Sequence, residues 1–289
     1  MQKNLKILAI ILLILGSIFA IKQFLPQMQK TSNAYMDKIK NYKLEDVKSI
    51  VISKNQEKIT ILKEKDLWWV EGKRGDKEKI EELLRGIFVE KPPELIAQTD
   101  QKHKEFEVLT DTGTTISLDD KIKIILGKSI VGDGVYARIE GDNNVYLLRN
   151  LYSSSFSSTP SFWMDKIIVS IDQTKLKKIE FIHDKNIQTI LYKDNRWIDE
   201  KTGVEVNKDK MEPILFSLSQ LKAESVLTSE NKEIYPSIPI LTIKLEADNG
   251  GETLEFYQGK DDYKVKRLSD KEEFLLTKSA AEKLVNYKT

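Results

Sequence analysis

The chain has 289 residues, of which 40% are hydrophobic and 31% are charged. These proportions are typical of a folded protein, and the length suits two domains of ordinary size. The 46 basic and 45 acidic residues leave a formal net charge of +1, which argues against a nucleic-acid partner because phosphate binding needs a clustered basic excess. The absence of cysteine excludes disulfides, thiolate metal sites and a cysteine nucleophile.

The N-terminal segment contains an uncharged apolar run from Ile7 to Ile21. Because residues 17–20 fit a signal-peptidase site poorly, we expect residues 1–25 to be an uncleaved transmembrane helix in contact with membrane lipid. A cleaved signal peptide is the alternative. The tail before the run is short, so we expect a single-pass protein of the cell membrane with the bulk of the chain on the extracytoplasmic side. Polar residues 26–43 are interpreted as a linker.

A stretch near the start of the remaining chain occurs twice. Val47 to Trp68 aligns without a gap with Leu176 to Trp197, at an offset of 129 residues. The identical pairs are Lys48/Lys177, Ile50/Ile179, Thr60/Thr189, Ile61/Ile190, Leu62/Leu191 and Trp68/Trp197. Such self-similarity predicts an internal duplication.

Each copy begins with strand-like runs and continues into a helix. In the first copy, isoleucines alternate over residues 47–63 and predict a β-hairpin, which a third strand at residues 68–70 follows. Asp76 then offers an N-cap for an amphipathic helix. The apolar face of this helix is predicted at Ile80, Leu83, Leu84, Ile87 and Phe88, and that of its counterpart at Met211, Ile214, Leu215, Leu218 and Leu221.

Four more short strands, separated by turn residues, follow the helix in each copy, over residues 114–148 and 240–276. The predicted fold class is therefore α+β: a transmembrane helix, then two duplicated, mainly antiparallel β domains with one amphipathic helix each. The predicted domains are an anchor (1–25), a linker (26–43), repeat one (44–150), a packed connector (151–170) and repeat two (171–289).

No catalytic, cofactor-binding or metal-ligating residue is predicted, and no enzymatic activity is expected. His103 and His183 lack a second ligand at metal-site spacing, so we interpret both as solvated surface residues. Gly127 to Gly134 lacks the ending of a phosphate-binding loop and is predicted to be a hairpin turn. Asp119-Asp120 and Asp261-Asp262 fall where turns are required.

Trp68 and Trp197 are the one aromatic position that both copies retain. The pair is our candidate ligand-binding site, because indole rings stack on sugars and other planar ligands. The alternative is that each ring fills the core between sheet and helix.

Several motifs occur together in one order: a hairpin ending in tryptophan, an amphipathic helix, a Leu-Gly-Lys sequence and a Val-Tyr-Leu-Leu strand. The residues that carry them are Val47 to Ile52, Trp68, Ile80 to Ile87, Leu126 to Lys128, Tyr136 and Val145 to Leu148. This combination resembles the bacterial domain-of-unknown-function family numbered 4340, in two tandem copies. The resemblance implies an envelope protein associated with ABC-type transport or gliding-related systems, and it supplies no catalytic residues.

We therefore expect a membrane-anchored, extracytoplasmic, non-enzymatic accessory or binding module of an ABC-type transport system. Its partner would be an envelope or transporter protein that contacts exposed strand edges. The alternative is a protein that binds an envelope glycan or lipid fragment through Trp68 and Trp197. A hydrolase with scattered carboxylates is a third hypothesis.

Overall fold

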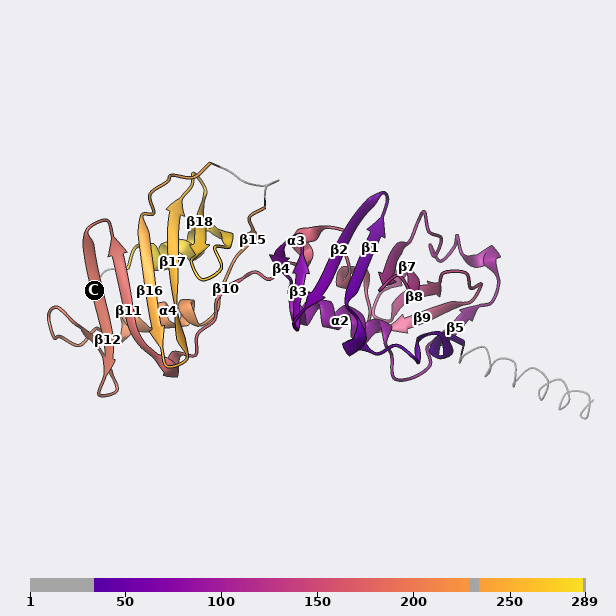
Figure 1. Ribbon diagram of the computed structural model, residues 1–289, viewed down its shortest axis with the longest axis horizontal. Helices are drawn as coiled ribbons and strands as arrows, with labels where there is room; N and C mark the ends of the chain where they lie inside the picture. The colour runs from indigo at the N-terminus through magenta and orange to yellow at the C-terminus, as the bar shows by residue number, and fades with distance from the viewer. Residues whose placement is uncertain (1–33, 229–233, 288–289) are drawn as a thin grey trace, which may run out of the picture. The chain divides into compact units, whose positions relative to one another are not determined.

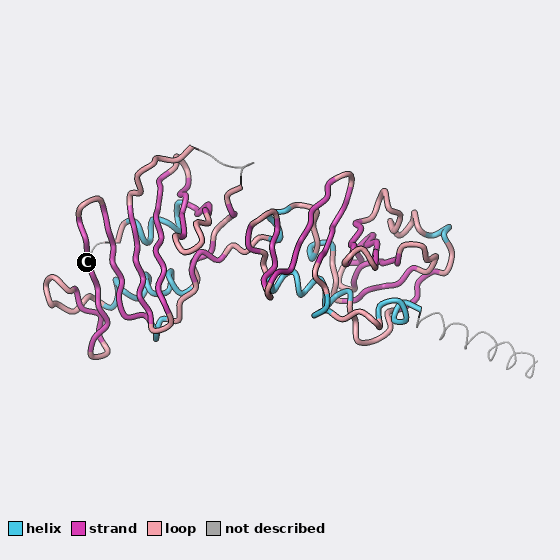
Figure 2. The backbone as a smooth tube through the Cα atoms, in the orientation of Figure 1, coloured by secondary structure: helices cyan, strands magenta, loops and turns pink. Residues whose placement is uncertain are grey.

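The computed structural model describes residues 34–228 and 234–287 (Figures 1 and 2). The chain divides into two compact units, Met1–Trp163 and Met164–Thr289. Each unit is built on an antiparallel β-sheet of its own.

The first unit contains a nine-stranded sheet in the order β4-β3-β2-β1-β6-β7-β8-β9-β5. Its strands are β1 (Ser49–Lys54), β2 (Glu57–Glu64), β3 (Leu67–Val70), β4 (Lys73–Arg74), β5 (Glu94–Ala97), β6 (Thr114–Leu118), β7 (Ile122–Ile130), β8 (Gly134–Ile139) and β9 (Val145–Arg149). Its helices are η1 (Leu44–Asp46), α2 (Lys77–Ile87), η2 (Asp100–Lys102), η3 (Ser153–Ser155) and α3 (Pro160–Trp163).

Helix α2 packs its apolar face into the core of this unit. The Asp76 side chain accepts a hydrogen bond from the Lys79 amide at 3.1 Å, which caps the first turn. The buried residues of the helix are Ile80, Leu83, Leu84, Gly86 and Ile87. Four of the five residues of the predicted apolar face are therefore confirmed, and the fifth, Phe88, is the half-buried C-cap.

The segment from residue 98 to residue 113 packs on strands β7 to β9 and forms a second buried cluster. Val108, Ile125 and Val145 are its fully buried members, and Phe106 and Tyr136 pack against them. Successive residues of a strand point to opposite faces of the sheet. A strand whose two faces are both covered by other parts of the protein therefore has apolar residues on both. These strands of the first unit are therefore shielded on both faces.

The second unit contains an eight-stranded sheet in the order β13-β12-β11-β16-β17-β18-β19-β15, and a two-stranded sheet of β10 and β14. Its strands are β10 (Ile167–Val169), β11 (Leu176–His183), β12 (Asn186–Lys193), β13 (Arg196–Asp199), β14 (Leu221–Lys222), β15 (Ser225–Val226), β16 (Leu241–Ala247), β17 (Gly250–Gln258), β18 (Asp262–Arg267) and β19 (Glu273–Thr277). Its helices are η4 (Gln173–Lys175), α4 (Lys208–Ser219) and α5 (Lys278–Val285).

The two large sheets share one strand order. The strands correspond as follows: β1 to β3 match β11 to β13, β6 to β9 match β16 to β19, and β5 matches β15. The two-residue strand β4 has no counterpart in the large sheet of the second unit. Helices α2 and α4 occupy the same place in the two sequences of elements. In both units, four strands separated by turn residues follow the helix and complete the large sheet.

The predicted fold class is wrong. The described chain is mainly antiparallel β-sheet with few helices. Its two longest described helices, α2 with 11 residues and α4 with 12, accompany sheets of nine and eight strands. Within residues 34–228 and 234–287, no helix is both long and apolar enough to span a membrane. The predicted anchor, residues 1–25, lies outside the described residues.

The segment expected to be a polar linker is packed, and the segment expected to be a packed connector contributes to both units. Tyr35 and Ile39, within the expected linker, are buried, and the Tyr35 hydroxyl donates to the Ile87 carbonyl at 3.0 Å. The expected connector, 151–170, divides between the units: Trp163 is buried in the first, whereas strand β10 belongs to the second.

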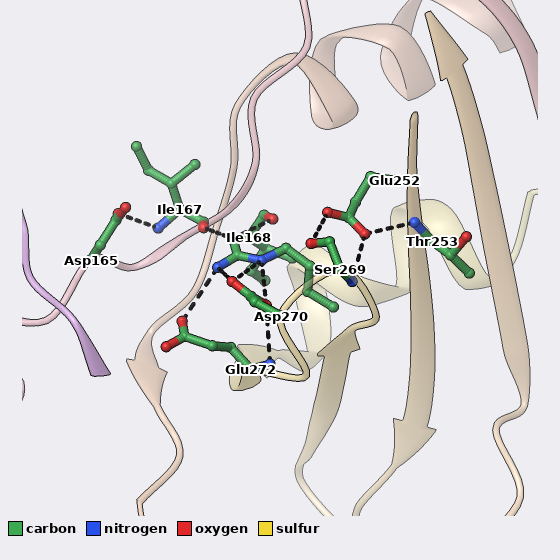
Figure 3. A network of polar contacts seen from close by, with 9 residues as sticks. Asp165, Ile167, Ile168, Glu252, Thr253, Ser269, Asp270 and Glu272 are labelled. Atoms are coloured by element: carbon green, nitrogen blue, oxygen red, sulfur yellow. Dashed lines mark hydrogen bonds and ion pairs between the residues drawn. The ribbon is translucent and has the colours of Figure 1, made fainter. Parts of the chain in front are cut away.

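A buried arginine fixes strand β10 in the second unit. Arg267, 9% exposed, donates to the Ile167 and Ile168 carbonyls at 2.7 and 2.9 Å. Its guanidinium also donates to Asp270 at 2.7 Å and to Glu272 at 3.3 Å. Figure 3 shows both carboxylates and both isoleucines gathered around this network. Charge-assisted bonds of this kind are stronger than neutral ones, so the turn after β18 holds the first strand of the unit.

The Asp270 carboxylate in this network predicts a loss of stability of the second unit in acid. Burial raises the pKa of Asp270, but hydrogen bonds from Arg267 and from the Glu272 amide outweigh it, so the pKa lies below its ordinary value of 3.8. A lowered native pKa contributes stability at neutral pH that is lost as the pH falls below the ordinary value and through the native one. We expect Asp270→Asn to flatten the fall in the urea midpoint between about pH 6 and about pH 3. An unchanged slope in the variant would show that other carboxylates control acid stability.

Candidate protein-binding groove

A groove of about 760 Å³ lies in the first unit, beside the C-terminal half of α2. This volume is within the range of pockets that bind ligands in proteins. The lining combines apolar residues with ionic ones: Glu82, Arg85, Gly86, Val89, Glu90, Lys91, Pro92, Pro93, Glu94, Leu147, Arg149 and Asn150. They come from helix α2, from the loop that leaves it and from strands β5 and β9.

A glycine allows α2 to approach the chain that follows β9. A Cβ atom added at Gly86 would lie 2.9 Å from Leu151 Cδ1, closer than real Cβ contacts. Leu151 is fully buried, so it has little room to move away. Any larger residue at Gly86 would push the helix outward and change the width of the groove.

The loop from Val89 to Pro93 forms one wall and leads directly into β5. Proline fixes its own φ angle and disfavours helical geometry in the residue before it. Helix α2 has already ended at Ile87, and the pair Pro92-Pro93 favours an extended backbone at the entry to β5. The two prolines restrict the backbone of this wall.

Strand β5 is the last strand in the order of the sheet. It pairs with β9 through Glu94–Leu147 and Leu95–Tyr146, and no other strand of the described chain pairs with it. An edge strand presents backbone donors and acceptors to which an extended segment can add. The groove and this edge meet at Glu94, the first residue of β5. A segment bound there could contact the apolar residues of the groove and form backbone hydrogen bonds with β5.

Three of the six ionic residues in the groove have ion-pair partners, and Arg149 and Glu94 pair with each other. Arg149 bonds to Glu94 at 2.7 Å and also to Asp133, while Arg85 lies 3.7 Å from Glu81. Three acidic and three basic residues appear in the lining. Because these charges balance, the groove favours a segment of low net charge over a strongly acidic or basic one.

A second, shallower hollow of about 590 Å³ lies on the large sheet of the second unit. Its lining includes an alternating set of charges in which Lys178 contacts Glu180 at 3.1 Å and Glu246 at 3.2 Å. Lys244 lies 3.6 Å from Glu180. Paired, solvated charges on an open sheet face are usual for an antiparallel sheet with one side in water, and this hollow offers little apolar surface.

The two predicted ligand-binding tryptophans have different surroundings and lie in different units. Trp68 is 1% exposed, and among the described residues its Nε1 atom has no hydrogen-bond partner. Trp197 is half-buried, and its ring centroid lies 5.0 Å from that of Tyr192. Trp68 therefore has the position of a core residue, and only Trp197 presents part of a ring to solvent.

Both histidines are less exposed than expected. His103 is 5% exposed, and its Nε2 atom lies 2.9 Å from the Asn143 carbonyl. His183 is half-buried, with Nε2 3.0 Å from the Val285 carbonyl. The prediction of solvated surface residues is thus wrong, because each ring bonds to a backbone carbonyl of a segment remote in sequence.

Asp119 and Asp120 lie at a turn, as predicted, whereas Asp261 lies at a bend and Asp262 is the first residue of β18. Asp119 has a left-handed backbone, and its carboxylate accepts the Ser49 amide at 2.6 Å. Asp262 accepts the Tyr235 hydroxyl at 2.9 Å. Among the described residues, no group of three His, Cys, Asp or Glu side chains could hold a metal ion.

The sequence contained a weak signal for the groove that pattern reasoning missed. Residues 91–111 read as an irregular stretch, yet Pro92-Pro93 directly before Glu94–Ala97 marks the entry to an edge strand. The pairing of β5 with β9 joins residues far apart in the sequence, so no local pattern could place Leu147 and Arg149 in the same wall.

Comparison with known proteins identifies a family without a described activity. The model of the family called "Domain of unknown function (DUF4340)" matches residues 88–237. That range includes β5 and β9 of the groove and continues into the second unit. No curated protein and no solved structure matches the chain. The match extends over half of the sequence, and the chain belongs to the DUF4340 family.

Proposed function

We propose that this chain is a non-enzymatic binding module that holds an extended segment of another protein in the groove of its first unit. The observation that carries the proposal is the position of the groove beside an edge strand. A segment lying there would bury apolar side chains against Val89 and Pro92 and bond through its backbone to β5. This is the β-augmentation mode of peptide recognition.

The partner class that we propose is a protein of an ABC-type transport system, met on the extracytoplasmic side. The support is the resemblance of the sequence to envelope proteins associated with such systems. A protein segment is also consistent with the balanced charges of the groove, which give a highly charged ligand no advantage.

We also infer that the two units are tandem copies of one domain. The inference is supported by the shared strand order and by the six identities between Val47–Trp68 and Leu176–Trp197. Duplication followed by divergence explains why one unit carries the groove while the corresponding residues of the other differ. At the positions of Glu82 and Arg85 in α2, helix α4 has Pro213 and the exposed Phe216.

One observation favours a second candidate function, the binding of a glycan. Tyr192 and Trp197 form a half-exposed aromatic pair in the second unit. Asp199 and Gln188, which bond to each other at 3.1 Å, lie on the same two strands. Aromatic rings beside polar groups are suited to sugars. Binding of an envelope glycan that Trp197→Ala abolishes, with groove variants unaffected, would establish this function in place of the first.

The protein-binding function is tested by affinity capture of the full-length chain from its native cells, followed by mass spectrometry. We expect a transport-system protein to be recovered in near-stoichiometric amount. The variant Val89→Asp with Pro92→Asp should reduce that recovery about tenfold or more, because it places two charges where apolar contacts form.

A matched control uses an exposed valine outside the groove. Val131 lies in the turn between β7 and β8 and is fully exposed, so Val131→Asp adds charge to the same unit without touching the groove. Both variants must show the circular dichroism and urea midpoint of the unmodified chain. Equal recovery with the groove variant and the control would refute binding in the groove.

A further inference from the structure

A second pocket of the first unit, about 260 Å³ in volume, is lined by residues of β1, β6 and β7 and of the segment after β9. Two buried apolar residues, Leu126 and Phe156, form part of its lining. Its other residues are mainly polar, and five carry hydroxyl groups: Thr112, Thr114, Ser153, Ser157 and Ser158. We call it the hydroxyl pocket. It shares no lining residue with the groove beside α2.

Three of the five hydroxyls have no partner in the described protein. Ser158 donates to Glu57 at 2.6 Å, and the Ser157 hydroxyl accepts the Thr159 amide at 3.0 Å. Within residues 34–228 and 234–287, the hydroxyls of Thr112, Thr114 and Ser153 bond to no other residue. Thr114 is only 3% exposed. Because an unpartnered buried hydroxyl is costly, the partner of Thr114 has to lie inside the pocket.

Two opposite charges line the pocket without pairing. Lys54 is the last residue of β1, and Glu107 precedes the segment that leads into β6. In the part of the chain that the structure describes, neither residue forms an ion pair. Glu107 repels an anion and Lys54 repels a cation. Together they favour an uncharged ligand that donates hydrogen bonds to the carboxylate and accepts them from the ammonium.

The second unit shows that the sheet itself does not require a hydroxyl at Thr114. Strands β1 and β11 align at an offset of 129 residues and pair with β6 and β16 in the same register, which matches Thr114 with Leu241. The next strands agree, because Thr114 pairs with Leu126 and Leu241 pairs with Phe256. Leu241 is fully buried. An apolar side chain therefore fits this position, and packing gives no reason for the hydroxyl.

Lys54 differs from its counterpart in the same way. It lies in the register position of His183, since Lys54 pairs with Glu57 and His183 with Asn186. In the second unit the protein supplies a partner, because His183 Nε2 lies 3.0 Å from the carbonyl of Val285, the last residue of α5. In the first unit the segment after β9 lines the pocket with serines instead. The ammonium is thus left for a ligand.

We propose that the hydroxyl pocket binds one sugar ring. Each sugar hydroxyl both donates and accepts, so one ring can donate to Glu107 and accept from Lys54 and Thr114. Phe156 offers apolar contact to the C–H groups of the ring. The volume lies below the usual range of pockets for drug-sized ligands, which limits the occupant to about one ring. The proposal goes beyond the protein-binding function and does not depend on it.

Saturation-transfer NMR of the full-length chain tests the proposal with glucose, galactose and N-acetylglucosamine, each at up to about 10 mM. We expect at least one of them to bind with a Kd of about 1 mM or below. The matching disaccharide should bind at least as tightly if the natural ligand is the end of a glycan, and more weakly if it is a free sugar. Binding of inorganic phosphate or glycine, with no signal from any sugar, overturns the ligand class. Silence from all three sugars overturns the proposal.

Two variants assign the binding to the hydroxyl pocket. Lys54→Met should weaken the sugar about tenfold and Thr114→Val about threefold or more. Thr114→Val should leave the urea midpoint unchanged or higher, because the lost hydroxyl has no protein partner. The matched control is Thr115→Val, since the next residue of β6 points to the opposite face of the sheet and does not line the pocket. Equal weakening by the two valine variants, or none by Thr114→Val, refutes the assignment.

Two further variants separate this inference from the functions proposed above. The groove variant Val89→Asp with Pro92→Asp should bind sugar as the unmodified chain does, so loss of captured protein and loss of sugar binding are independent results. Trp197→Ala should also leave sugar binding unchanged. Sugar binding that Trp197→Ala abolishes and Thr114→Val does not affect would place the site in the second unit and overturn the inference.

Discussion

Replacing Arg267 with alanine is expected to lower the free energy of unfolding of the second unit by about 3–5 kcal/mol. The substitution leaves the Asp270 and Glu272 carboxylates and two backbone carbonyls without the guanidinium that they bond. Removal of one member of a buried ionic network costs more than the network itself contributes, because the charge of Glu272, whose side chain is 9% exposed, stays out of water. Hydrogen exchange should therefore rise across strands β10, β18 and β19.

The matched control is a second arginine of the same unit. Arg196 pairs with Glu205 at 3.6 Å on the surface, with 54% of its side chain exposed. Exposed ion pairs contribute about 0–1 kcal/mol, so Arg196→Ala should change the urea midpoint little. Equal destabilisation by the two substitutions would contradict the role given to Arg267 as the anchor of β10.

The substitution Trp68→Ala should destabilise the first unit by about 3–5 kcal/mol, as large-to-small changes of fully buried aromatic residues do. Trp197→Ala should cost only about 1 kcal/mol, because its ring is half-buried. Urea denaturation followed by circular dichroism measures both. The difference separates a core residue from a surface one at equivalent positions of the repeat.

Trp68→Phe provides a further discrimination at the same site. Phenylalanine keeps most of the apolar contact and removes the indole N–H, which has no acceptor within the described residues. We expect a much smaller loss of stability than with alanine, since the unsatisfied donor is removed together with part of the ring. If phenylalanine and alanine cost the same, the indole N–H has a partner that stabilises the native unit.

The sequence was most informative where structure follows from local patterns. Alternating isoleucines gave the hairpin of β1 and β2, in which Ile50 pairs with Ile61 and Ile52 with Ile59. The spacing of Ile80, Leu83, Leu84 and Ile87 gave helix α2 and its buried face. Both signals arise from the fixed periods of strands and helices, so they can be read without knowing what packs on them.

Features that depend on remote pairing could not be read in this way. His103 appears in a charged stretch of the sequence, yet it is buried. Its ring bonds to the Asn143 carbonyl, 40 residues further along the chain. Trp68 and Trp197 are identical residues at aligned positions, but their burial differs with the residues around them. The groove combines α2, β5 and β9, which only the completed sheet brings together.

The most direct test of the central claim is residue-specific cross-linking in the native cell. A photo-reactive phenylalanine analogue placed at Val89 samples the groove, and the same analogue at Val131 samples exposed surface of the same unit. We expect the Val89 probe alone to give a discrete cross-link to one defined protein, mapped to an extended apolar segment of it. The same products from both positions, or none from Val89, would contradict the account of the groove as a protein-binding site.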